Sequence, residues 1–168
     1  MDSYNFVVKQ SPKIVIELEP NQKPKWGTMT PQQMVEHLSL RFAYASKKVK
    51  GVPFMTSERM AFYKAKFFND QKPIRKNFTA KGLIPADQGV KNRYKDLKEA
   101  VFVYKKSLEE FDKYFKINPI ALTYHPFFGY LSFEEWIFYY DLHIKHHFYQ
   151  FGLIDEDNNP IKQVISVS

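Results

Sequence analysis

Cysteine is absent from the 168-residue chain. Its absence excludes disulfides, thiolate zinc sites and cysteine nucleophiles. No apolar run approaches the roughly 20 residues that a membrane-spanning helix needs. The N-terminus, Met1-Asp2-Ser3-Tyr4-Asn5, also lacks the basic and then apolar pattern of a signal peptide. From these absences we expect a cytoplasmic protein with no membrane partner.

Glycine is scarce, with 6 residues, whereas aromatic side chains make up 17% of the chain. Apolar residues account for 44% and charged residues for 26%, a balance typical of globular rather than disordered proteins. A chain of this length normally folds as one domain and can bury a core without disulfides. We therefore expect residues 1–168 to form a single domain with a core rich in aromatic rings.

Acidic residues are in deficit, with 18 Asp and Glu against 25 Lys and Arg, which gives a net charge of +7. The segment 64–98 holds ten of the cations and three of the acids, so its excess equals the net charge of the whole chain. A solvated connection between helices is the simpler interpretation. The alternative is a module that binds a polyanion or nucleic acid through this segment. Nucleic acid is disfavoured because the segment lacks a recognisable helix-turn-helix or RNA-binding signature.

Two capping boxes mark the beginnings of helices, one in Thr30-Pro31-Gln32-Gln33 and one in Ser132-Phe133-Glu134-Glu135. Apolar residues at three- and four-residue spacing extend these helices and predict others. The predicted helices span residues 31–48, 57–69, 94–115 and 132–151. Four helices joined by two short connections and one long connection, residues 71–92, predict an all-α four-helix bundle.

The two ends of the chain have a β-branched character. Ile14-Val15-Ile16 and Leu18 are typical of a short strand, and residues 161–167 have a similar composition. We therefore expect a small β ribbon formed by the two ends beside the bundle.

Five histidines are the main candidates for chemistry. His143 and His147 lie about 40° apart on a helical wheel, within the aromatic stripe that should face the core. Two imidazoles four residues apart on one face can bind one cation, and His37 could supply a third from the first long helix. Such a site keeps a position open for water or substrate. The residues between His143 and His147 do not include the glutamate of a metalloprotease, so that class is disfavoured.

Several segments together resemble the DinB/YfiT-like superfamily, and most closely an uncharacterised bacterial branch whose last helix ends in a His-His-x-x-Gln-Phe-Gly pattern. The matching segments are Trp26-Gly27-Thr28-Met29-Thr30-Pro31-Gln32-Gln33-Met34-Val35-Glu36-His37-Leu38, His125-Pro126-Phe127-Phe128-Gly129, Leu131-Ser132-Phe133-Glu134-Glu135-Trp136 and His143-Ile144-Lys145-His146-His147-Phe148-Tyr149-Gln150-Phe151-Gly152. The match covers residues 26–152, which would form the domain core, with flanking extensions 1–25 and 153–168.

The resemblance implies an up-down-down-up bundle with a long crossover. It also implies a divalent metal ion held by His37, His143 and His147. Three imidazoles and a water suit zinc, nickel, iron or manganese, so the identity of the metal stays open. His146 is the rival ligand, although its position on the flank of the helix favours the rim of the site.

Four further residues are candidates for the chemistry around the metal. His125 should anchor the turn before the last helix, and it could also transfer protons. Gln150 and Tyr140 share the inner face and could orient a metal-bound water, although packing explains Tyr140 equally well. Arg41 could contact an anionic substrate group or extend its head to solvent. Glu36 points away from His37 and is expected at the surface.

Characterised members of the superfamily include transferases and isomerases in which the metal activates a low-molecular-weight thiol. The resemblance therefore implies a metal-dependent enzyme acting on a small molecule, with a thiol or water as nucleophile, as an S-transferase or a hydrolase. A chain without cysteine fits a nucleophile supplied by a cosubstrate. The non-catalytic polyanion-binding module is the alternative, and a homodimer is compatible with the ring-rich bundle.

Overall fold

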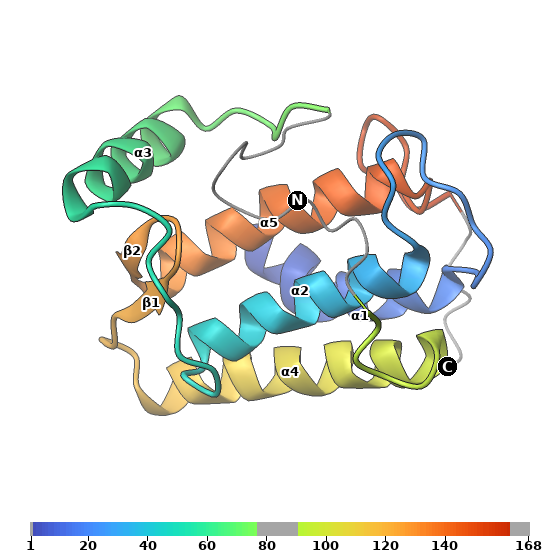
Figure 1. Cartoon of the computed structure of the whole chain (residues 1–168), viewed down its shortest axis with the longest axis horizontal. Coiled ribbons are helices and arrows are strands. Elements are labelled where there is room, and N and C mark those ends of the chain that lie inside the picture. The colour runs from blue at the N-terminus through green and yellow to red at the C-terminus, as the bar shows by residue number, and fades with distance from the viewer. Residues whose placement is uncertain (1, 77–90, 162–168) are drawn as a thin grey trace.

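The computed structural model describes residues 2–76 and 91–161, and within them the chain is mostly helical (Figure 1). This confirms the predicted fold class. The helices are α1 (Ser11–Ile14), α2 (Pro31–Ala45), α3 (Ser57–Asp70), α4 (Leu97–Ile117) and α5 (Phe133–Gln150). Two short strands, β1 (Thr123–His125) and β2 (Gly129–Leu131), form an antiparallel hairpin between α4 and α5.

Both predicted capping boxes are present, and they fix where α2 and α5 begin. The Thr30 hydroxyl accepts from the Gln33 amide at 3.2 Å, while the Gln33 side chain accepts from the Thr30 amide at 2.9 Å. Ser132 and Glu135 make the same reciprocal pair at the start of α5. Because each cap sets the phase of its helix, it also sets which residues face the core.

The N-terminal segment is a helix and not a strand, so that prediction is wrong. A π-helical stretch (Asn5–Gln10), α1 and a 3-10 turn (Val15–Glu17) follow one another without a break, and we call residues 5–17 the N-terminal helix. The buried positions here include 7, 11, 14 and 18, which is a helical spacing. The β-branched run obscured that period. The predicted ribbon of chain ends is excluded by this helix, and residues 162–168 lie outside the described part of the chain.

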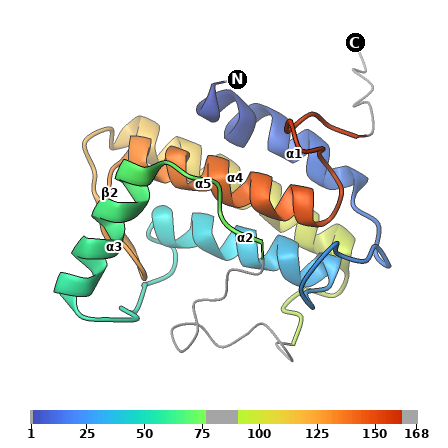
Figure 2. The ribbon, with the colours of Figure 1, turned by 90° about the horizontal axis from the view of Figure 1, so that it is seen from above.

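The bundle consists of the N-terminal helix, α2, α4 and α5. In Figures 1 and 2, α2 and α4 run in one direction while the N-terminal helix and α5 run in the other. The order along the chain is therefore up-down-down-up, and a long crossover joins α2 to α4.

The crossover contains α3, which was predicted as a member of the bundle. Instead, α3 lies across one end of the bundle beside the hairpin (Figure 2). Only Met60 of α3 is buried, and Phe62 is 62% exposed. The amphipathic pattern therefore predicted the helix correctly but not its position in the fold. Phe67 of α3 packs on Phe128, and Phe68 packs on Phe138, at the end of the bundle.

Aromatic rings fill the space between α2, α4 and α5. Phe42 packs against Tyr104, Phe111 and Tyr140, and Tyr140 stacks on Trp136. This ring cluster holds α2 and α5 at a fixed separation near the middle of the bundle, where His37 faces His143.

No helix within residues 2–76 and 91–161 is long and apolar enough to cross a membrane.

Candidate metal centre

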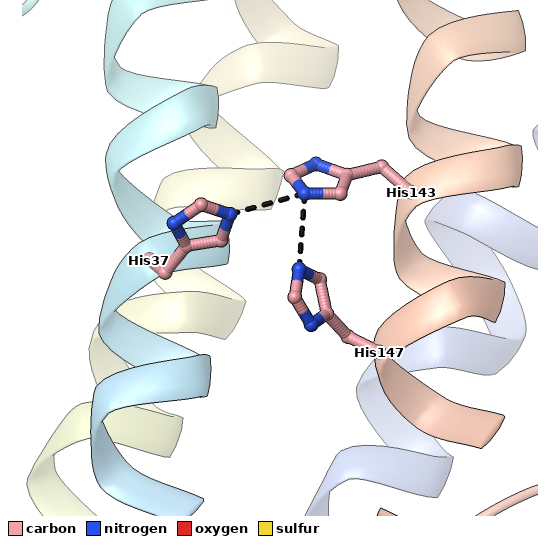
Figure 3. Close-up of side chains that lie close together, drawn as sticks. All are labelled: His37, His143 and His147. Carbon is pink, nitrogen blue, oxygen red and sulfur yellow. Dashed lines mark hydrogen bonds between the residues drawn. The ribbon is translucent and has the colours of Figure 1, made fainter. Parts of the chain in front are cut away.

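Three histidines converge between α2 and α5, as the sequence pattern predicted. His37 projects from α2, and His143 and His147 project from successive turns of α5 (Figure 3). Nε2 of His143 lies 3.0 Å from Nε2 of His37 and 3.1 Å from Nε2 of His147. His143 and His147 are buried and His37 is partly buried. The bundle therefore holds three imidazole nitrogens around one point.

The spacing of these nitrogens fits one divalent ion. The three ligand atoms lie within 4.8 Å of one another. In a tetrahedral site with metal–nitrogen bonds of about 2.0–2.1 Å, neighbouring nitrogens are about 3.3 Å apart. The His143 nitrogen lies slightly closer than this to its two neighbours, at 3.0 and 3.1 Å, while the nitrogens of His37 and His147 lie within 4.8 Å of each other, so small shifts of the rings would be needed around an ion. The cluster could thus hold a metal ion with at least one coordination position left for another ligand.

A chain of hydrogen bonds fixes the orientation of His147. The side-chain amide of Gln150 donates to the backbone carbonyl of Trp26 at 2.8 Å, which leaves the Gln150 carbonyl oxygen free to accept. That oxygen lies 2.9 Å from Nδ1 of His147. Nδ1 therefore carries the proton, and the Nε2 lone pair points into the cluster. Gln150 therefore orients His147, a contact that the sequence did not reveal.

Without a metal ion, the contacts of His143 with the other two imidazoles are unfavourable. Its Nε2 is in contact with two other Nε2 atoms, and one nitrogen with one proton or one lone pair cannot make good hydrogen bonds to both. Nε2 of His147 presents a lone pair to the cluster. A proton on Nε2 of His143 could therefore be donated to His147 or to His37, but not to both. A cation at the centre would turn all of these contacts into favourable ones.

The three imidazoles are held in the neutral form that binds metals. Burial is the largest cause, and it places the pKa of His37 and of His143 well below the usual value of 6.5. Burial, followed by the neighbouring His146 and Arg41, lowers the pKa of His147 to about 3, although the hydrogen bond with Gln150 acts in the opposite direction. Neutral imidazoles present lone pairs at neutral pH without first having to release a proton.

Arg41 lies one turn beyond His37 on α2 and is only 7% exposed. Most of the side chain is therefore buried, and whether the head contacts an anion or extends to solvent stays open. Its backbone carbonyl accepts a 2.8 Å hydrogen bond from the Tyr140 hydroxyl, which occupies that hydroxyl and gives Tyr140 a structural role. After burial, the Arg41 charge is the next cause that lowers the pKa of His37. The guanidinium thus lies close to the candidate site.

His146 and His125 lie outside the cluster. Nδ1 of His146 is 3.2 Å from the backbone carbonyl of Ile74, and its ring packs edge-on against Trp26, on the flank of α5. Nδ1 of His125 accepts from the amides of Phe127 and Phe128 at 3.0 and 3.2 Å, which confirms that it anchors the turn. Its Nε2 is buried and has no partner among the residues that the structure describes.

Glu36 is buried, in contrast to the surface position that we expected. Its carboxylate accepts from the amides of Arg93 and Tyr94 at 2.8 and 3.2 Å and from the Gln32 side chain at 2.9 Å. These bonds tie the end of the crossover to α2, because two backbone amides and one side-chain amide satisfy the carboxylate. The role of Glu36 is structural.

The basic segment 64–98 is only partly within the described structure, which omits residues 77–90. Lys64 forms an ion pair with Glu135 and donates to the carbonyl of Tyr130. The Lys76 ammonium lies over the rings of Trp26 and Tyr149. These cations serve local contacts, and a polyanion-binding role for the segment stays a prediction.

Comparison of the sequence with models of known families found no match, and neither curated proteins nor solved structures gave one. The resemblance of the motifs therefore does not assign a family. What stands is a mostly helical protein whose cluster of His37, His143 and His147 could hold a metal ion.

Proposed function

We propose that this chain is a metal-dependent enzyme that acts on a small molecule. One observation carries the proposal: three neutral imidazoles from two helices direct their Nε2 atoms at one point. Sites of three protein ligands that keep an open position are typical of catalytic metals, whereas structural sites use four protein ligands. The motif resemblance to the DinB/YfiT-like superfamily supports the same proposal.

The metal would be divalent, with zinc, nickel, iron and manganese all compatible with nitrogen ligands. An ion of this kind, when bound, lowers the pKa of a coordinated water or thiol and polarises a substrate oxygen. A thiol nucleophile would have to come from outside the chain, because the protein has no cysteine. An S-transferase with a low-molecular-weight thiol and a hydrolase with water are the two reaction types that fit.

The chain's own residues would supply orientation and an enclosed setting. Gln150 holds His147 in the tautomer that presents Nε2 to the cluster. Tyr139 packs against the His143 ring at a centroid distance of 5.0 Å and helps to exclude water from that side. The hydroxyl of Tyr140 on α5 donates to the backbone carbonyl of Arg41 and so ties α5 to α2 beside the cluster. Such rigid support is what a catalytic metal site needs.

Metal analysis by mass spectrometry tests the proposal on protein purified without a tag or a chelator. We expect about one equivalent of a divalent metal per chain in the wild type, and less than a tenth of that in His143→Ala and in His147→Ala. His146→Ala is the matched control, because His146 is the adjacent histidine outside the cluster, and it should keep the metal. Metal-free wild-type protein that also fails to load with zinc, nickel, iron or manganese would refute the proposal.

A further inference from the structure

Arg41 is a largely buried charged residue of α2 that has no acidic partner among the residues that the structure describes. It is 7% exposed, and it shares a face of α2 with His37 because four residues separate them. Each ion pair within residues 2–76 and 91–161 involves a lysine, and none of them includes Arg41. A buried guanidinium is normally paired with an acid, because burial without a partner is costly.

The surroundings of Arg41 hold its guanidinium in place but do not neutralise it. Its central carbon lies 5.8 Å from the centre of the Tyr44 ring. On the α5 side its charge acts on the hydroxyl of Tyr139, the residue that packs against His143, and opposes the rise in the Tyr139 pKa that burial causes. The Tyr140 hydroxyl anchors the backbone carbonyl of Arg41 at 2.8 Å. The phenols of Tyr44 and Tyr139 beside the guanidinium carry no charge that could balance it, and a guanidinium has five N–H donors to satisfy.

Arg41 follows His37 by one turn of α2, so the two side chains are neighbours on one face of that helix. Long side chains on an α-helix lean toward the preceding turn, which for Arg41 is the turn that carries His37. The charge and the imidazole cluster thus share one part of the bundle interior.

From this juxtaposition we propose that Arg41 is the anion-binding residue of the site and that the small-molecule substrate carries a carboxylate or phosphate group. The planar fork of the guanidinium pairs two of its N–H donors with two oxygens of either group. The inference rests on the proposed function, because the metal and Arg41 would bind two parts of one substrate. It narrows the substrate to anionic molecules.

Anion titrations of the Co²⁺-loaded protein test the proposal. Acetate, inorganic phosphate and the uncharged acetamide are added in turn, and binding is followed in the visible spectrum of the Co²⁺ ion. We expect a saturable change with acetate or phosphate and none with acetamide. The stronger of the two anions tells whether a carboxylate or a phosphate substrate is preferred.

Variants assign the binding to Arg41. Arg41→Gln should weaken anion binding about ten- to a hundredfold while keeping one metal ion per chain. Arg41→Lys retains the charge without the fork and should lie between the two, and it serves as the test if Arg41→Gln does not fold. Arg59→Gln, at an exposed position on α3, is the matched control and should bind anions as the wild type does.

Two results would overturn the anion site: wild-type protein that binds neither anion, or Arg41 variants that bind both as tightly as the wild type. Failure of the metal site is a separate outcome. If no metal loads, the same titrations are followed by NMR chemical shifts of the arginine side chains in the metal-free protein. An anion-dependent shift that is lost in the Arg41 variants would then support the anion site alone, and its absence would refute it.

Discussion

At the scale of single residues, the site depends on side chains that never touch the metal position. Gln150 links the backbone of Trp26 to His147 through two hydrogen bonds of 2.8 and 2.9 Å. Groups that orient a metal ligand in this way typically contribute a factor of 10 to 100 in metal affinity. Gln150 was predicted to orient a water, because the helical wheel gives its face but not its partner.

Replacing Gln150 by leucine should therefore weaken metal binding about 10- to 100-fold, since His147 loses the acceptor that fixes its tautomer. Gln150→Glu keeps an oxygen that can accept from Nδ1 of His147 but loses the donor to the Trp26 carbonyl, so its affinity should lie between those of the leucine variant and the wild type. Competition titrations with a chromophoric chelator measure both affinities. A leucine variant with wild-type affinity would show that the hydrogen bond to His147 does not matter for binding.

Gly27 gives a second test of the same contact. Its φ is +80°, and a Cβ added there would lie 2.9 Å from the side-chain nitrogen Nε2 of Gln150. Gly27→Ala should cost about 1 kcal/mol of stability from the backbone alone and should also weaken metal binding by displacing Gln150. Gly129→Ala is the matched control, because Gly129 has a φ of +74° and an added Cβ meets nothing within 4 Å. Equal metal affinity in the two alanine variants would contradict the role of this contact.

At the scale of elements, the N-terminal helix makes a prediction that a strand would not. In a helix, Ile14 and Ile16 point to different sides, and they are 2% and 51% exposed. Ile14→Ala should lower the free energy of unfolding by about 2–4 kcal/mol, whereas Ile16→Ala should change it by less than about 0.5 kcal/mol. Urea denaturation measures both. A strand would place both residues on one face, so equal effects would contradict the helix.

The turn between β1 and β2 should make stability depend on pH. Burial, and then the charge of Arg41, hold the pKa of His125 well below its usual value of 6.5. As the pH falls below 6.5, His125 is protonated in the unfolded chain but stays neutral in the folded chain. The free energy of unfolding therefore falls by up to about 1.4 kcal/mol per pH unit. His125→Asn keeps a side-chain acceptor for the two turn amides and does not titrate. Its stability should fall less steeply between pH 6.5 and 5 in urea denaturation series, and equal slopes would refute this explanation.

The elements also show where sequence reasoning stops. The beginnings of α2 and α5 were predictable because Thr30 and Ser132 carry local capping signals. The cluster of His37, His143 and His147 was predictable for two reasons. The spacing of His143 and His147 places them on one face of a helix, and His37 lies near the middle of the first long helix, at a similar depth in the bundle. The place of α3 and the burial of Glu36 depend on contacts with distant segments, and no local pattern encodes them.

At the scale of the whole molecule, one ion would join α2 to α5 across the bundle. A ligand that binds only the folded chain stabilises it in proportion to the logarithm of its concentration over Kd, by about 2.7 kcal/mol at a hundredfold excess over Kd. The melting temperature should therefore rise when the metal is added and fall when a chelator removes it. His143→Ala should show no such dependence. A chelator that lowers the melting temperature of both proteins equally would mean that it acts elsewhere.

The central claim is that His37, His143 and His147 bind one divalent ion through their Nε2 atoms. A crystal structure of the metal-loaded protein, with anomalous scattering recorded at the absorption edge of the ion, tests it most directly. We predict a single strong anomalous peak about 2.0–2.2 Å from each of the three Nε2 atoms, with a non-protein ligand in a remaining position. A peak elsewhere in the molecule, or none in protein that carries a full equivalent of metal, would contradict the account.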